Sequence, residues 1–188
     1  MMKERSSIGC RIRNAFSWLL LLGAIILGVL LGLGMLNSPS AAAAIRQIEE
    51  APGQIVYQAR QTVNDQHGNT WQAIAFQRVR PDGTTSFDLR LVGFPGMAEI
   101  DHTQPLTITN SLGKSFTATD TSSNIFADAA QSEPNVGQYN LQALLSELPA
   151  EIPAKLSVPT LSGDAVSLSV SPSSIQEWRS ILKDKETG

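Results

Sequence analysis

From residue 45 onward, much of the chain alternates between apolar and polar positions with a period near two, which is typical of β-strands with one buried face. The alternation is clear at residues 55–63 and cleanest at residues 87–91. At residues 71–80 the pattern is less regular, because Ile74 and Phe76 lie on the face opposite to the other apolar side chains. This strand is therefore predicted either to be covered on both faces or to contain a β-bulge.

Turn-forming sequences separate these strands at residues 64–69 and 81–84, and two further strand pairs flank residues 110–113 and 162–164. Short connections favour antiparallel neighbours, so these turns predict successive β-hairpins. The stretch 120–138 is polar and rich in turn-forming residues, which predicts a long mobile loop.

Two segments have the spacing of short amphipathic helices. Four leucines recur at i, i+3, i+4 and i+7, which predicts a helix over residues 140–148 that ends at Pro149. Ser171 and Pro172 are helix-start signals ahead of an apolar stripe, which predicts a closing helix over residues 172–183. The fold class is thus mainly β, a β-rich α+β domain built as an antiparallel barrel or sandwich with two short helices.

The N-terminal segment has the character of a hydrophobic helix. Residues 15–36 are 22 positions without a charge, and they follow a basic segment; as a helix they would span about 33 Å, enough for a hydrocarbon core. That length favours a retained anchor, whereas the small residues 41–44 after Pro39 favour cleavage by a signal peptidase. Residues 1–44 are accordingly predicted to be a signal peptide or membrane anchor, and residues 45–188 a single exported β-rich domain.

Charge is unevenly distributed along the chain. Residues 1–44 carry a net charge of +3 and residues 45–188 one of −6, within a total of −3. The acidic exported part argues against nucleic-acid binding, because a phosphate backbone is bound by basic surfaces. Its net charge favours a partner that presents Lys or Arg. Asp88 is expected to lie opposite Arg78 and Arg80 as a solvated cross-strand ion pair.

The residues that usually carry chemistry are few. The only cysteine, Cys10, precedes the apolar segment, so the exported part has no disulfide, no thiolate nucleophile and no Cys-ligated metal. His67 and His102 lack the spacing of a zinc site. Asp101 adjoins His102, yet neighbouring strand residues point to opposite faces and would not form a catalytic pair. No catalytic residue, metal ligand or cofactor is predicted.

Several separated blocks of sequence resemble, in the same order, an uncharacterised family of exported cyanobacterial proteins. The resemblance covers about residues 45–180 and implies a photosynthetic bacterium and a location across the thylakoid or plasma membrane. It implies no catalytic or binding residues. The blocks are Glu49-Glu50-Ala51-Pro52-Gly53-Gln54, Arg78-Val79-Arg80-Pro81-Asp82-Gly83-Thr84-Thr85, Leu91-Val92-Gly93-Phe94-Pro95-Gly96 and Thr109-Asn110-Ser111-Leu112-Gly113-Lys114.

These observations favour a non-enzymatic accessory protein of the thylakoid lumen or periplasm that docks on a membrane or photosynthetic complex. Its partner would be a protein on or near a membrane, with membrane contact through residues 15–36 if these are not cleaved. Recognition is expected on polar loops, at the turn that contains His67 and at Asp128, Glu133 and Asn135 in the predicted loop.

Two alternatives remain open from the sequence. A β-barrel with Trp71, Phe76 and Phe87 around a cavity would hold a small apolar ligand such as a lipid or pigment. A hydrolase is a more distant alternative, and it would need His102 and a carboxylate to converge in a cleft.

Overall fold

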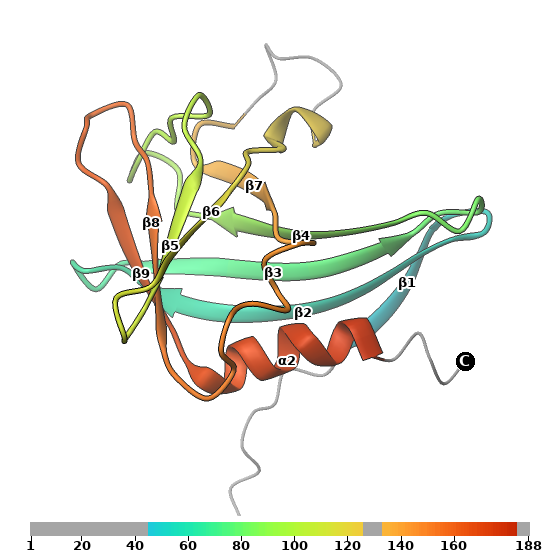
Figure 1. Ribbon diagram of the computed structural model, residues 1–188. Helices are drawn as coiled ribbons and strands as arrows, with labels where there is room; N and C mark the ends of the chain where they lie inside the picture. The colour runs from blue at the N-terminus through green and yellow to red at the C-terminus, as the bar shows by residue number, and fades with distance from the viewer. Residues whose placement is uncertain (1–44, 126–132, 184–188) are drawn as a thin grey trace, which may run out of the picture. The chain divides into compact units, whose positions relative to one another are not determined.

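The computed structural model describes residues 45–125 and 133–183, which form a mainly β domain as predicted (Figure 1). Its strands build two antiparallel sheets, and one α-helix, α2 (Pro172–Lys183), closes the described part of the chain. A short 3-10 helix, η1 (Ser122–Asn124), precedes β7. The strands are β1 (Arg46–Ala51), β2 (Gln54–Asn64), β3 (Thr70–Val79), β4 (Thr85–Val92), β5 (Leu106–Asn110), β6 (Ser115–Ala118), β7 (Val136–Asn140), β8 (Ala154–Val158) and β9 (Val166–Val170).

The larger sheet has the strand order β1-β2-β3-β4-β7. β1 to β4 follow one another as antiparallel hairpins, and the turns predicted at residues 64–69 and 81–84 connect β2 with β3 and β3 with β4. β7 then returns from a distant part of the sequence to pair with β4. The larger sheet therefore combines predictable local hairpins with one long-range strand pairing.

The smaller sheet has the order β6-β5-β8-β9, with hairpin turns at both of the other predicted sites. Two isolated bridges link it to the larger sheet, between Asp65 and Leu168 and between Asp120 and Tyr139. These single bridges do not continue as strand ladders, so the described strands form two sheets rather than a closed barrel. The barrel form of the prediction is wrong for this part of the chain.

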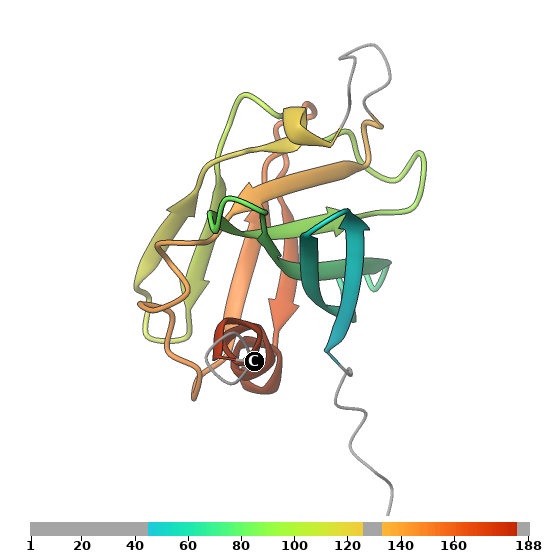
Figure 2. The same cartoon turned by 90° about the vertical axis from the view of Figure 1, so that its right-hand side faces the viewer.

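One hydrophobic core is shared by both sheets and α2. Trp71, Phe87 and Tyr139 from the larger sheet are fully buried in it, together with Trp178 of α2. α2 runs alongside β2 and β3, with its predicted apolar stripe turned into the core (Figures 1 and 2). The inner face of the larger sheet is therefore filled by packing.

The irregular pattern of β3 reflects burial on both faces. Trp71 and Ala75 point into the shared core, whereas Ile74 and Phe76 pack with Val56 in a second cluster on the outer face. The register of β3 with β2 and with β4 is continuous, so the strand is covered on both sides and contains no bulge.

The predicted helix over residues 140–148 is not present. The apolar spacing correctly predicted which side chains are buried, because three of the four leucines are fully buried. The backbone forms successive turns instead: Ser146 Oγ donates to the Ala143 carbonyl, and Glu147 N donates to Leu144 rather than to Ala143. A side chain that competes for a backbone acceptor disfavours a continuous helix in so short a segment.

The predicted mobile loop over residues 120–138 is also too long. Residues 122–124 form η1 and residues 136–138 belong to β7, and only residues 126–132 lie outside the described structure. Asp120 holds the start of this segment, because its carboxylate accepts hydrogen bonds from the backbone and the hydroxyl of Ser122. Polar residues here form hydrogen bonds with one another within the fold. Composition alone does not distinguish such a segment from a mobile loop.

The predicted N-terminal hydrophobic helix lies within residues 1–44, outside the described residues. In the part of the chain that the structure describes, no helix has the length and apolar character needed to cross a membrane.

Candidate functional site

The outer face of the larger sheet gathers five arginines from widely separated positions. Paired residues in a sheet point to the same face, and positions two apart along a strand share a face. Arg60 pairs with Ile74, which pairs with Arg90, while Arg78 lies two residues from Phe76 on the same face. We call this surface the arginine face; its arginines are Arg46, Arg60, Arg78, Arg80 and Arg90.

Two of these guanidinium groups flank a buried aromatic ring. The Cζ atoms of Arg78 and Arg90 lie 5.4 and 5.3 Å from the centre of the Phe76 ring. Arg90 also donates from Nε and from a terminal nitrogen to Gln138 Oε1, at 3.2 and 2.9 Å. Burial, followed by the positive charge of Arg78, lowers the pKa of Arg90. The arginines thus form part of the packed structure of this face as well as its charge.

The face carries two carboxylates with different roles. Arg78 Nε donates to Glu50 Oε2 at 2.9 Å, and this bond holds the pKa of Glu50 below its ordinary value. Asp88 is only 4% exposed and accepts a hydrogen bond from Thr121 Oγ1 at 3.3 Å. Five arginines against two carboxylates leave the arginine face net positive.

The expected ion pair of Asp88 with Arg78 and Arg80 is not formed. The register places Asp88 opposite Phe76, while Ser86 lies opposite Arg78. Arg78 instead reaches across β2 to Glu50. The sequence correctly predicted that Asp88, Arg78 and Arg80 share one face of the sheet, but the predicted ion pair between them was wrong.

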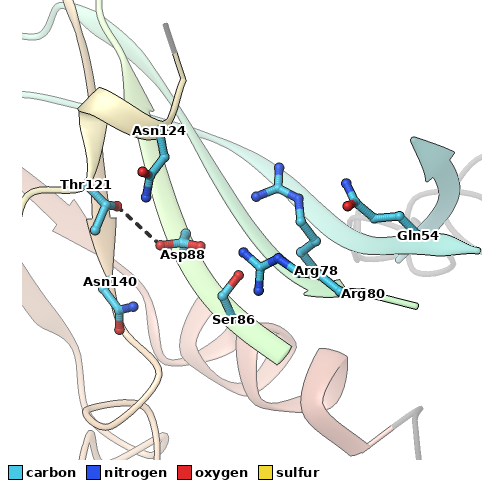
Figure 3. Close-up of a pocket in the computed structure, with 8 residues that line it drawn as sticks. All are labelled: Gln54, Arg78, Arg80, Ser86, Asp88, Thr121, Asn124 and Asn140. Carbon is cyan, nitrogen blue, oxygen red and sulfur yellow. Dashed lines mark hydrogen bonds between the residues drawn. The ribbon is translucent and has the colours of Figure 1, made fainter. Parts of the chain in front are cut away.

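A hollow of about 480 Å³ opens on the arginine face (Figure 3). In Figure 3 both arginine head groups lie between Asp88 on β4 and Gln54 on β2. Arg78 belongs to β3, and Arg80 follows the end of that strand. The Thr121 and Asn124 side chains, at and next to η1, form the opposite wall. All the residues that line the hollow are polar: Gln54, Arg78, Arg80, Ser86, Asp88, Thr121, Asn124 and Asn140.

Several polar groups of this hollow lack partners within residues 45–125 and 133–183. Arg80 is exposed and has no carboxylate within 4.0 Å, and Ser86 Oγ is buried without a hydrogen bond. The Asn124 side chain likewise has no bond to the described residues, whereas Asn140 Oδ1 accepts from Gln142 N. Arg80 offers only donors, and the Ser86 hydroxyl and the Asn124 amide can also donate, so the hollow suits an anionic or acceptor-rich ligand.

The three aromatic residues predicted to line a ligand cavity do not lie together. Trp71 and Phe87 are fully buried in the shared core, where they pack against other side chains. Phe76 projects from the opposite face of the same sheet, under Arg78 and Arg90. One cavity cannot be lined by all three residues.

The residues predicted for docking have different environments. His67 is exposed in the turn between β2 and β3, and Glu133 is exposed before β7. Asn135 is buried and donates from Nδ2 to the Gly93 carbonyl at 2.8 Å, so it holds β4 and β7 together. Asp128 lies outside the described residues.

His102 pairs with a carboxylate, although not with its neighbour Asp101. Its Nδ1 lies 3.1 Å from Asp120 Oδ2, which also accepts from Ser122 Oγ at 3.0 Å. The carboxylate therefore stands between the imidazole and the hydroxyl, whereas a nucleophilic triad needs the imidazole in the middle. No group of three or more potential metal-ligating side chains occurs in the described part of the chain.

The arginine face was missed by sequence reasoning, although a signal for it exists. Arg78 and Arg80 are two positions apart at the end of one strand, and Arg90 lies farther from the turn on the partner strand of the hairpin, opposite Ile74. Placing the register of that hairpin would have put all three on one face. The contribution of Thr121, Asn124 and Asn140 depends on the long-range pairing of β7 and has no local signal.

Fold and site together define a mainly β domain of two antiparallel sheets, whose larger sheet has a polar, arginine-rich outer face. The chain belongs to the family described as "Protein of unknown function (DUF3122)", which matches residues 43–181. This confirms the resemblance to an uncharacterised family over nearly the whole domain. No curated protein and no solved structure matches the chain.

Proposed function

We propose that this protein is a non-enzymatic accessory protein, exported to the periplasm or thylakoid lumen, that docks through the arginine face onto an acidic surface of a partner protein. The observation that carries this proposal is the separation of charge. Residues 45–188 have 10 basic and 16 acidic side chains, and five of those 10 basic side chains lie on this one face. The remainder of the exported part is strongly acidic.

Such a distribution favours oriented association. A positive face on an otherwise negative domain is attracted to a negative partner in one orientation and repelled in the others. The net charge alone favours a partner that presents Lys or Arg, but the distribution of charge over the fold favours the opposite sign at this face. The planar guanidinium group also binds carboxylates with defined geometry, which gives specificity as well as attraction.

The test compares two double variants of the tagged full chain. Arg46→Gln/Arg60→Gln removes two exposed charges from the arginine face, whereas Lys114→Gln/Lys155→Gln removes two exposed charges elsewhere. Each is captured from solubilised membranes over a series of salt concentrations. The proposal expects one set of captured proteins that weakens with salt, is reduced at least five-fold by the arginine variant and persists in the lysine variant. Equal capture by both variants would overturn it.

A further inference from the structure

The hollow on the arginine face contains one arginine that forms no ion pair with the described residues. Arg78 is paired directly with Glu50, and Arg90 lies two residues from Asp88 on the same face of β4, where the Asp88 charge favours its protonated form. Arg80, at the rim, has no carboxylate within 4.0 Å among the described residues, and the neighbouring Asp82 carboxylate accepts hydrogen bonds from Thr84 instead. A negative group placed in the hollow would therefore give Arg80 the ion pair that it lacks.

Hydrogen-bonding groups around this position are arranged for an acceptor. The Asn124 side-chain amide has no partner among the described residues, and the Ser86 hydroxyl at the base of the hollow has none either. The acidic group of the hollow, Asp88, is almost fully buried and accepts a hydrogen bond from the Thr121 hydroxyl. A ligand therefore meets the donors of Arg80 and the amide of Asn124, which can also donate.

We propose that this hollow receives one carboxylate, the side chain of an Asp or Glu on the partner protein, with Arg80 as its main contact. This inference rests on the proposed function and specifies the group that the arginine face recognises. A carboxylate supplies the ion pair that Arg80 lacks, and its two oxygens match the fork of a guanidinium group. The volume of about 480 Å³ admits a Glu side chain with part of its flanking backbone.

A phosphate or an anionic lipid headgroup would also be attracted to arginines. A phosphate dianion brings more charge than the unmatched Arg80 balances, and it would lie close to the Asp88 carboxylate. A lipid surface needs a broad cationic face, and two carboxylates interrupt this one. The balance of charges therefore favours a protein carboxylate.

The experiment uses the purified full chain in an uncharged detergent and a blocked peptide, acetyl-Gly-Ser-Glu-Ser-Gly-amide, with its Gln counterpart as control. NMR titration follows the side-chain Nε–Hε signals of the arginines. We expect the Glu peptide to shift the Arg80 signal and to bind at least ten-fold more tightly than the Gln peptide. Equal affinity of the two peptides would overturn the inference.

Matched variants localise the interaction. Arg80→Lys keeps the charge but removes the fork, and it is expected to weaken Glu-peptide binding at least five-fold. Lys155→Gln removes an exposed charge on β8, outside the arginine face, and should leave binding unchanged. A loss of equal size in both variants would overturn the assignment to the hollow.

Two further probes separate the other anions. Tighter binding of inorganic phosphate than of the Glu peptide, or Arg80-dependent binding to phosphatidylglycerol vesicles without Glu-peptide binding, would overturn the carboxylate assignment. The proposed function is tested by a different measurement, the capture of partner proteins by the Arg46→Gln/Arg60→Gln variant. Suppose that the Arg80→Lys variant still captures the partner and the double variant does not. Docking through the arginine face would then stand, and the assignment of a carboxylate to the hollow would be overturned.

Discussion

Arg78 and Glu50 join the centre of the larger sheet to its edge. The Nε and a terminal nitrogen of Arg78, on β3, donate to the two carboxylate oxygens of Glu50, on β1, at 2.9 and 3.4 Å. β2 lies between these two strands, so the pair spans a whole strand on the outer face. It fixes Arg78 beside the Phe76 ring and leaves Arg80 as the cation available at the rim of the hollow.

Glu50→Gln should make the fold less sensitive to acid. The pKa of Glu50 is lowered from its ordinary value of 4.5, mainly by the Arg78 hydrogen bond. A lowered folded-state pKa contributes stability that is present above pH 4.5 and is lost as the pH falls through the folded value. Because the pair is partly exposed, the variant should lose at most about 1 kcal/mol at pH 7.

Urea unfolding at pH 7 and pH 3.5 measures this effect for the wild-type chain and for Glu50→Gln. The difference between the two chains should shrink at the lower pH. Glu133→Gln, an exposed carboxylate without an ion pair to the described residues, is the control. A Glu50→Gln difference that is the same at both pH values would contradict the prediction.

Gly93→Ala should destabilise the domain by about 1–3 kcal/mol, because an added methyl group overfills the packing there. A Cβ at Gly93 would lie 2.8 Å from a ring carbon of Trp71, and that ring is fully buried in the core. Combining Gly93→Ala with Trp71→Phe should cost less than the sum of the two single variants, because the smaller ring relieves the clash. Additive losses in denaturant midpoints would show that the ring is not the obstacle.

The local features of the fold were largely predictable from the sequence. The turns at residues 64–69, 81–84 and 110–113, and the buried face of Phe87, Leu89 and Leu91, follow from periodicity and turn chemistry that act within a few residues. The closing helix was found for the same reason, since its start signals and its apolar stripe lie in one short segment.

The remaining features depend on contacts that are remote in sequence. β7 joins the sheet by pairing with β4, about 48 residues earlier at Arg90 and Gln138, and no local pattern announces that pairing. The prediction of a helix over residues 140–148 was wrong because the backbone bonds of this segment alternate between three-residue and four-residue turns, which the apolar spacing does not distinguish from a helix. The hollow is formed by the β3–β4 hairpin together with residues that the long-range pairing of β7 brings close. Only its arginines, which lie on the hairpin, could be predicted from the sequence.

Arg179→Lys should destabilise the domain by about 1–3 kcal/mol although it keeps the charge. The Arg179 guanidinium on α2 donates to the carbonyl groups of Leu145, Ser146 and Leu148 in the non-helical segment after β7. A lysine ammonium cannot serve three divergent acceptors with the same geometry, so partly buried carbonyls would lose their partners. Arg60→Lys, on an exposed side chain, should change the free energy of unfolding by less than about 0.5 kcal/mol. Equal midpoints for the two variants would contradict the capping role.

Tyr139→Phe should make the fold more resistant to alkali. The Tyr139 ring is fully buried, and its hydroxyl has no hydrogen-bond partner among the described residues. Burial raises the pKa of Tyr139 well above its ordinary value of 10.0, and the nearby charges of Asp120 and Asp101 raise it further. The folded state therefore holds the neutral phenol at a pH where the unfolded chain ionises it.

The sign of the effect follows from this difference. With a raised folded-state pKa, the stability from Tyr139 is complete below pH 10 and is lost as the pH rises, by up to about 1.4 kcal/mol per pH unit. Phe has no proton to lose, so the variant should lack this component between pH 10 and pH 12. At pH 7 it should stay within about 1 kcal/mol of the wild-type chain, because only an unpaired hydroxyl is removed.

Guanidinium unfolding at pH 7, 10 and 11.5 tests both statements, and Tyr57→Phe, at a partly exposed position, is the matched control. Tyr57→Phe leaves the Tyr139 phenol in place, so it should retain the alkaline loss that Tyr139→Phe removes. If Tyr139→Phe loses stability above pH 10 as steeply as the wild-type chain does, the buried phenol is not the group that limits the alkaline stability of this fold.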